Sequence, residues 1–196
     1  MDKGFTTEIR DRVLIIRFDR PEIRSPISVH MIEGLAAIFA EGQKLKDTHA
    51  VVFTGTRDVF ASGADLREIA KVEPNEARAF AERGQALMNS IAESTVLTVA
   101  AVNGFCFGGA LDLALACDRR IASPNAVFAH PGTSRGIITG WGGTQRLPRI
   151  VGEAIALEMF FTAGRIEAEN ALRTGLVEAI ADDVLQAAIA MASANS

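Results

Sequence analysis

What is scarce in this 196-residue sequence excludes several classes of protein. It contains two cysteines, three histidines, one tryptophan and no tyrosine. Two cysteines are too few for a disulfide framework, and His30, His49 and His130 are not spaced like metal ligands. We therefore predict buried, unreactive thiols at Cys106 and Cys117 and no metal site. The net charge of −4, without any block of like charges, argues against nucleic acid as a partner.

Long apolar runs are also absent. No stretch approaches the length of a membrane span, and the first residues, MDKGFTTEIRD, contain no signal-peptide apolar core. These absences predict a cytoplasmic protein with no membrane partner. Hydrophobic residues make up 48% of the chain, enough for one sizeable core. We therefore expect a single domain over residues 1–196.

Small apolar residues and glycines are concentrated in residues 98–118, TVAAVNGFCFGGALDLALACD. The run at 98–102 predicts a buried strand, and Asn103-Gly104 ends it. After Gly108-Gly109, residues 110–117 predict an almost wholly apolar helix with one acid, Asp112. The first N–H groups of a helix have no internal partner, and glycine lets a ligand approach the backbone closely. This stretch therefore predicts a place where negative charge is bound.

A second glycine-containing loop lies upstream, in residues 60–69, FASGADLREI. It follows a predicted buried strand at residues 50–54 and leads into a helix that begins near Asp65. Two such loops, each placed after a strand, can offer one backbone N–H apiece to the same oxygen. Paired donors of this kind form an oxyanion hole.

The rest of the chain alternates short strands with helices. Asp11-Arg12 is predicted to join two hairpin strands, and Ser28 is predicted to cap a helix. Further strands are predicted at residues 5–10, 13–18, 96–102, 120–122, 126–128 and 176–180, and helices at residues 28–45, 75–92, 153–161, 167–174 and 184–194. This order by itself predicts only the α/β class.

Taken in order, several motifs resemble the enoyl-CoA hydratase/isomerase (crotonase) superfamily over roughly residues 5–185. They are DRPE at 19–22, FASGADL at 60–66, NGFCFGG at 103–109, ACD at 116–118, GGTQRL at 142–147, AGRI at 163–166 and GLV at 175–177. Each motif alone is weak, but the ordered set is specific. The resemblance implies a crotonase-like (ClpP/crotonase) spiral of repeated β-β-α units.

The resemblance also implies which residues form the site. The oxyanion N–H groups fall on Ala64 and Gly109, and they would polarise the thioester carbonyl of an acyl-CoA. Arg24 is the cation best placed to meet a CoA phosphate. The remaining positions implied in substrate binding are Ala61, Gly63, Asp65, Leu66, Gly108, Gly132 and Trp141.

The acid positions depart from the family pattern. Hydratases of this family typically use two glutamates, and here these positions are Asp112 and Gly132. Asp112 is the candidate acid–base residue, although an acid in the first turn of a helix is also favoured by the helix dipole. His130 is a candidate substitute for the missing acid, although a lone histidine beside a proline is more commonly structural. Trp141 stands where the family commonly has a small residue, so it is a candidate wall of the acyl pocket.

Three functions stay open at this point. The nominal one is an enoyl-CoA hydratase, which adds water to a 2-enoyl-CoA. An isomerase tolerates a single acid better, and a catalytically weak acyl-CoA-binding protein tolerates its loss. No permanent cofactor is expected, because coenzyme A is part of the substrate. The resemblance implies a homo-oligomer, a trimer or hexamer, but the usual C-terminal helical trimerisation segment is expected to be largely absent.

Overall fold

The larger of two sheets forms the base of the molecule. A computed structural model describes residues 3–41 and 45–194. The sheet has the strand order β1-β2-β3-β5-β7-β10, and all its neighbours are parallel except β1 and β2. Its strands are β1 (Phe5–Arg10), β2 (Val13–Phe18), β3 (Ala50–Thr54), β5 (Leu97–Val102), β7 (Arg119–Ala122) and β10 (Ala179–Ile180).

The hairpin of β1 and β2 confirms its prediction. Arg10 pairs with Val13, so only Asp11 and Arg12 form the turn. Both residues have positive φ, 49° and 61°. A two-residue turn with positive φ at both positions matches the twist of antiparallel strands.

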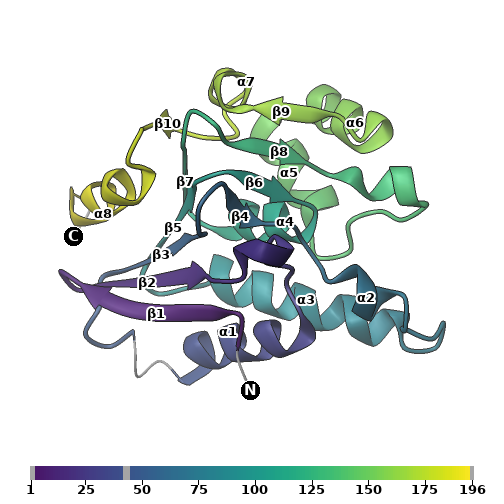
Figure 1. Ribbon diagram of the computed structural model, residues 1–196, viewed down its shortest axis with the longest axis horizontal. Coiled ribbons are helices and arrows are strands. Elements are labelled where there is room, and N and C mark those ends of the chain that lie inside the picture. Colours follow the sequence, from purple (N-terminus) through teal and green to yellow (C-terminus); the bar gives the residue numbers. More distant parts are fainter. Residues whose placement is uncertain (1–2, 42–44, 195–196) are drawn as a thin grey trace.

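Both faces of the larger sheet are covered. Along β2, Leu14 and Ile16 join the main core, whereas Val13 and Ile15 face the opposite way into a second cluster. The main core includes side chains of α1 (Val29–Glu41), α3 (Ala77–Ala92) and α4 (Gly109–Ala116), and the second cluster is closed by α8 (Val184–Ala194). Figure 1 shows α8 and α1 on different sides of this sheet. Burial on both faces explains why these strands are continuous apolar runs.

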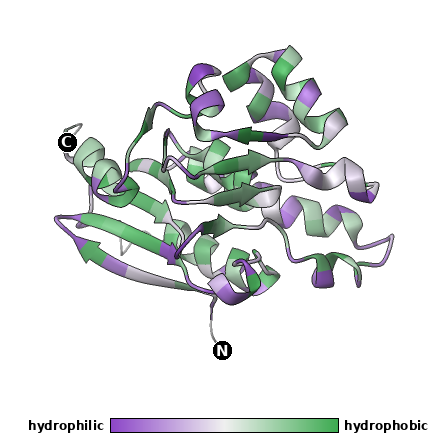
Figure 2. Cartoon of the chain, turned by 45° about the horizontal axis from the view of Figure 1, so that its top comes forward, coloured by the Kyte–Doolittle hydropathy of each residue, from purple (hydrophilic) through white to green (hydrophobic). Residues whose placement is uncertain are grey.

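The smaller sheet has the order β4-β6-β8-β9. Strands β4 (Val59–Ala61), β6 (Phe105–Phe107) and β8 (Val127–Ala129) are parallel, and β9 (Arg165–Glu167) is antiparallel to β8. The sequence predicted only the third of these strands, because three residues are too few to show an alternation. The inner strands of both sheets are mostly green, the colour of hydrophobic residues, in Figure 2.

The two sheets are built from the same repeat. The pairs β3-β4, β5-β6 and β7-β8 each give their first strand to the larger sheet and their second to the smaller one, and helices follow each pair. The remaining helices are α2 (Leu66–Ile69), α5 (Gly143–Val151), α6 (Glu153–Thr162) and α7 (Ala168–Arg173), with 3₁₀ turns η1 (Pro21–Ile23) and η2 (Pro131–Arg135). This repetition confirms the predicted β-β-α architecture.

Some predicted boundaries need correction. The helix expected over 28–45 ends at Glu41 and Leu45 lies in a turn, while residues 42–44 fall outside the described part of the chain. The last strand is only Ala179–Ile180. Within the described ranges, no helix is both long and apolar enough to cross a bilayer.

Candidate active site

The candidate site lies at one edge of the smaller sheet. Strands β4, β6 and β8 run parallel, so their carboxyl ends meet at the same edge. Ala64 follows β4, Gly109 follows β6 and His130 follows β8 directly. These three short strands, of which the sequence predicted only β8, therefore position the predicted residues.

The two glycine loops touch one another. A Cβ built on Gly63 would lie 2.6 Å from the Phe107 carbonyl oxygen and 3.0 Å from the Gly109 nitrogen. A Cβ on Gly109 would lie 3.3 Å from the Ala64 nitrogen. Gly63 also has a φ of 94°, which a residue with a side chain adopts only under strain. The structure therefore brings the two predicted amide donors together.

The Ala64 amide is directed by the neighbouring chain. Ile27 N–H donates to the Gly63 carbonyl (2.8 Å), and Asp65 N–H donates to the Ile27 carbonyl (3.1 Å). In an extended chain, the N–H and C=O groups of successive residues point alternately to opposite sides. The Ala64 N–H, which lies between the Gly63 carbonyl and the Asp65 N–H, therefore faces away from Ile27. No hydrogen bond among the described residues uses the N–H of Ala64 or of Gly109.

The other residues predicted around the first loop take different positions. Ala61 is fully buried at the end of β4, whereas Leu66 is half exposed. The Asp65 side chain accepts a hydrogen bond from Arg67 N–H (2.9 Å) and pairs with the Arg67 guanidinium (2.7 Å). The side-chain hydrogen bond from Arg67 lowers the pKa of Asp65. Arg24 is exposed, with its guanidinium 5.6 Å from the centre of the Phe105 ring.

Asp112 is enclosed in the first turn of α4. Its side chain is buried, and its Oδ2 accepts a hydrogen bond from the Thr139 hydroxyl. Burial raises the pKa of Asp112 to about 7, although the Thr139 hydrogen bond partly opposes this. A carboxyl group with this proton affinity can both take and give a proton near neutral pH.

His130 lies beside that carboxyl group. Its Nε2 is 3.5 Å from Asp112 Oδ1, and burial lowers the pKa of His130 to about 4. The imidazole is therefore neutral at neutral pH. Its ring also lies 5.2 Å from the ring of Phe160 on α6, centre to centre.

The position of the missing second acid is closed by its own loop. A Cβ on Gly132 would lie 2.7 Å from the Ile137 carbonyl oxygen. Ile137 N–H donates to the Gly132 carbonyl (3.1 Å), which holds this loop together. A side chain at position 132 would therefore force the backbone to move.

Trp141 covers the second glycine loop. A Cβ on Gly109 would lie 2.4 Å from its ring, and a Cβ on Gly84 of α3 would lie 2.2 Å from the other side of the indole. The Phe80 ring is 6.1 Å away, centre to centre. Trp141 is thus buried between α3 and the start of α4, next to the Ala64 and Gly109 amides.

Sequence analysis missed three residues that shape this site. Thr139 binds the carboxyl group, Gly143 leaves space beside it, and Gly84 leaves space for Trp141. Gly143 belongs to a motif that carried the resemblance, but nothing in the local sequence singled out Thr139 or Gly84.

Both predicted thiols are buried and free, and burial raises the pKa of each. No cluster of three or more potential metal-ligating side chains occurs in the described ranges.

Comparisons with known proteins identify the family and the fold. The sequence model of the Enoyl-CoA hydratase/isomerase family matches residues 8–194. The human enoyl-CoA hydratase domain-containing protein 2, mitochondrial, is 39% identical over 163 residues, which are 83% of this chain and 56% of that protein. The chain therefore spans little more than half the length of this relative.

Solved structures share the fold over nearly the whole chain. Pseudomonas aeruginosa DspI has a TM-score of 0.92 at 34% identity, covering 97% of this chain and 79% of its own. An enoyl-CoA hydratase from Bacillus anthracis has a TM-score of 0.91 at 32% identity, covering 97% and 75%. The crotonase-like spiral is thereby confirmed.

One prediction is wrong by these comparisons. A cytoplasmic location was expected, but the human, cattle and mouse relatives are all named as mitochondrial proteins. The expectation depended on the absence of a signal-peptide core, whereas mitochondrial transit peptides are amphipathic and rich in arginine. The fold, the paired glycine loops and the family match lead to one assignment: the chain belongs to the enoyl-CoA hydratase/isomerase family.

Proposed function

We propose that the chain binds an acyl-CoA and stabilises the enolate of its thioester between the N–H groups of Ala64 and Gly109. The observation that carries this proposal is the approach of the two glycine loops, with both amides unused by other described residues. Two N–H donors aimed at one oxygen stabilise the charge that develops there, and losing one typically costs about 10²–10³ in rate. The donors belong to the backbone, so the function does not depend on particular side chains.

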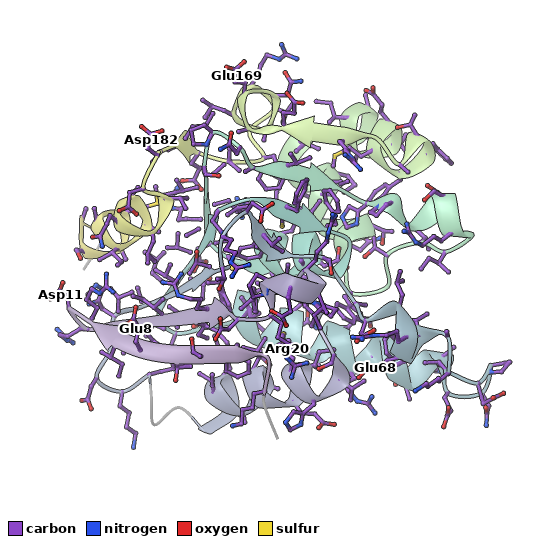
Figure 3. The ribbon with its side chains drawn as sticks, in the orientation of Figure 1. Glu8, Asp11, Arg20, Glu68, Glu169 and Asp182 are labelled. Carbon is purple, nitrogen blue, oxygen red and sulfur yellow. The ribbon has the colours of Figure 1, made fainter. Side chains whose placement is uncertain are left out.

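A groove beside Trp141 supports the same substrate class. It has a volume of about 340 Å³ and reaches Phe80, whose ring packs against Trp141. Its lining combines apolar side chains, which suit an acyl chain, with two cations and two carboxylates: Val29, Glu68, Lys71, Val72, Glu76, Ala79, Phe80 and Arg83. Glu68, labelled on α2 in Figure 3, also accepts a hydrogen bond from Val29 N–H (2.7 Å) and so ties this wall to α1.

Within this class, the nominal reaction is hydration of a 2-enoyl-CoA with Asp112 as the acid–base group. Its proton affinity near neutral pH supports that role. Arg24, Gly63, Asp65, Leu66 and Gly108 border the bound substrate in the same proposal. A homo-oligomer is proposed with it, and sedimentation of the purified protein tests that part.

A specific observation favours an isomerase as the second candidate. The loop closes on Gly132, so no carboxylate stands at the second acid position. Moving a double bond needs one group that carries a proton between two carbons, whereas adding water benefits from both a base and an acid. A catalytically weak acyl-CoA-binding protein is the third outcome.

Hydration of crotonyl-CoA, followed by loss of its conjugated thioester absorbance, tests the proposal. Asp112→Asn should lower kcat by about 10²–10⁴-fold, since it removes the proton carrier. Asp182→Asn is the matched control, because Asp182 is exposed and lies near α8, far from Glu68 and α2 in Figure 3. Turnover of a 3-enoyl-CoA without hydration would favour the isomerase, and binding without either turnover would contradict both activities.

A further inference from the structure

Asp112 and His130 form a buried pair whose facing atoms are unsatisfied. Asp112 Oδ1 and His130 Nε2 are 3.5 Å apart, and their side chains are only 1% and 3% exposed. Neither atom, nor His130 Nδ1, has a hydrogen-bond partner among the described residues. Buried polar atoms are rarely left unpaired, because the loss of hydration is then uncompensated. The two facing atoms need only a small approach to satisfy each other.

The backbone of Gly143 packs closely against this pair. A Cβ on Gly143, at the start of α5, would lie 2.1 Å from Asp112 Oδ1 and 3.0 Å from His130 Cε1. Any side chain at position 143 would thus enter the space next to the two facing atoms. The other carboxyl oxygen, Oδ2, is already held by the Thr139 hydroxyl. The backbone N–H groups of Trp141 and Gly143 also face the carboxyl group and lower the pKa of Asp112. Oδ1 nevertheless has no hydrogen-bond partner among the described residues, and His130 Nε2 lies beside it.

Within residues 3–41 and 45–194, no other charged side chain makes a hydrogen bond to Oδ1. Arg146 on α5 acts on Asp112 through its charge, but it donates to Asn89 Oδ1 (2.8 Å) and to the Trp141 carbonyl (3.3 Å). Cys106 on β6 is a protonated buried thiol, since burial raises its pKa well above the usual range. On the far side of His130, α6 presents the apolar ring of Phe160.

We propose that His130 is the positioning residue of Asp112, and that one hydrogen bond between Nε2 and Oδ1 persists in both protonation states of the carboxyl group. When Asp112 is ionised, His130 is the Nε2–H tautomer and donates to Oδ1; when Asp112 is protonated, its O–H donates to Nε2, and the ring proton has moved to Nδ1. The bond to the ionised carboxylate is the stronger of the two. The proton taken from water or from substrate carbon stays on the carboxyl group, and the imidazole remains neutral. The catalytic consequence of the pair depends on the proposed function, but the pairing itself does not.

Nuclear magnetic resonance of the whole protein without substrate tests the pairing. Aspartate is labelled with ¹³C at the carboxyl group and histidine with ¹⁵N, and Asp112→Asn identifies the Asp112 signal. We expect the His130 Nε2 resonance to change with the same midpoint as the Asp112 carboxyl. A constant His130 resonance while Asp112 titrates would overturn the proposal, and this measurement needs no variant of His130.

Substitutions then separate pairing from packing. His130→Phe keeps an aromatic ring but removes the hydrogen bond, so the Asp112 midpoint should rise by about one pH unit. His130→Gln retains an N–H donor and should shift the midpoint less. Thr139→Val is the matched control, since it frees only Oδ2 and leaves the His130 resonance following Asp112. If His130→Phe folds and the Asp112 titration midpoint is unchanged, the pairing is refuted. If His130→Phe does not fold, equal Asp112 midpoints in His130→Gln and His130→Leu refute it.

Activity distinguishes this proposal from the proposed function. If crotonyl-CoA is not hydrated and the two resonances still titrate together, the hydratase assignment fails and the pair stands. If hydration occurs, the acid limb of the pH profile of kcat/KM should move with the Asp112 midpoint in His130→Phe, with kcat changing more than KM. If hydration occurs but the acid limb of the kcat/KM profile does not move in His130→Phe, the pairing is contradicted and the proposed function is not.

Discussion

The site has a backbone half and a side-chain half, and they differ in how closely they follow the family pattern. In the backbone half, Gly63 and Gly109 stand where the resemblance requires them, and a Cβ built on Gly63 would lie 3.0 Å from the Gly109 nitrogen. In the side-chain half, Asp112 replaces one glutamate, Gly132 replaces the other, and His130 lies against the remaining acid. The backbone half therefore follows the family pattern, while the acidic positions of the side-chain half depart from it.

The difference follows from what each half demands of the sequence. An N–H donor needs only a backbone position, which a glycine at a tight contact fixes. A proton carrier needs a particular side chain and a surrounding that sets its pKa. The second requirement can be met in several ways. Where position 132 carries a glycine, His130 and Thr139 can provide the surroundings of Asp112.

Breaking the backbone half should have the largest effect. Gly63→Ala places a Cβ 2.6 Å from the Phe107 carbonyl oxygen, so the two loops must separate. We expect a loss of about 10²–10³ in kcat, as for removal of one oxyanion donor. Gly152→Ala is the matched control, since Gly152 also has a positive φ, 85°, but nothing lies within 4 Å of its Cβ. Equal kcat in the two variants, measured with crotonyl-CoA, would contradict the oxyanion geometry.

The side-chain half should be visible in the pH dependence of stability. The pKa of Asp112 is raised in the folded protein to about 7, so its contribution to stability is present at low pH and is lost as pH rises from about 4 to about 7. The pKa of His130 is lowered to about 4, so its contribution is present above its ordinary pKa of 6.5 and is lost as pH falls toward 4. Between pH 4 and 6.5 the two contributions oppose each other and nearly cancel.

Substituting either Asp112 or His130 should reveal the pH dependence of stability that the other residue contributes. In Asp112→Asn, the free energy of unfolding should rise with pH between 4 and 6.5, by up to about 3 kcal/mol relative to the parent protein. His130→Gln should show the opposite slope. Urea unfolding at a series of pH values measures both, and parallel curves for the parent and the two variants would mean that neither group is buried as the structure places it.

The sequence predicted the larger sheet better than the smaller one. Strands such as Ala50–Thr54 are buried on both faces and stand out as apolar runs. The smaller sheet is made of three-residue strands, of which β4, β6 and β9 left no pattern. These strands nevertheless bring Ala64 and Gly109 close together, a proximity that was predictable from the motifs but not from the local strand pattern.

The side-chain half was only partly predictable for a related reason. Asp112 and His130 were candidates by residue type, but their separation of 3.5 Å depends on the end of β8 meeting the first turn of α4. Thr139 lies 27 positions from Asp112 along the chain, and no local signal marks it. Contacts between distant segments of this kind come from tertiary packing, which spacing in a sequence does not report.

Trp141 joins the two halves and should have the smallest effect of the substitutions considered. Its ring contacts Gly109 on one side and approaches the groove through Phe80 on the other, so it limits the space beside the amides. Trp141→Ala should raise kcat/KM for longer or branched acyl groups relative to crotonyl-CoA by about 10–200-fold, the range typical of one methylene-sized change in an apolar pocket. Gly84→Ala is the companion variant, since its Cβ would lie 2.2 Å from the indole and press the ring toward Gly109, lowering turnover of every acyl-CoA. If Trp141→Ala leaves the ranking of acyl-CoA substrates by kcat/KM unchanged, the acyl chain does not bind beside Trp141. The groove would then not belong to the same binding site as the Ala64 and Gly109 amides.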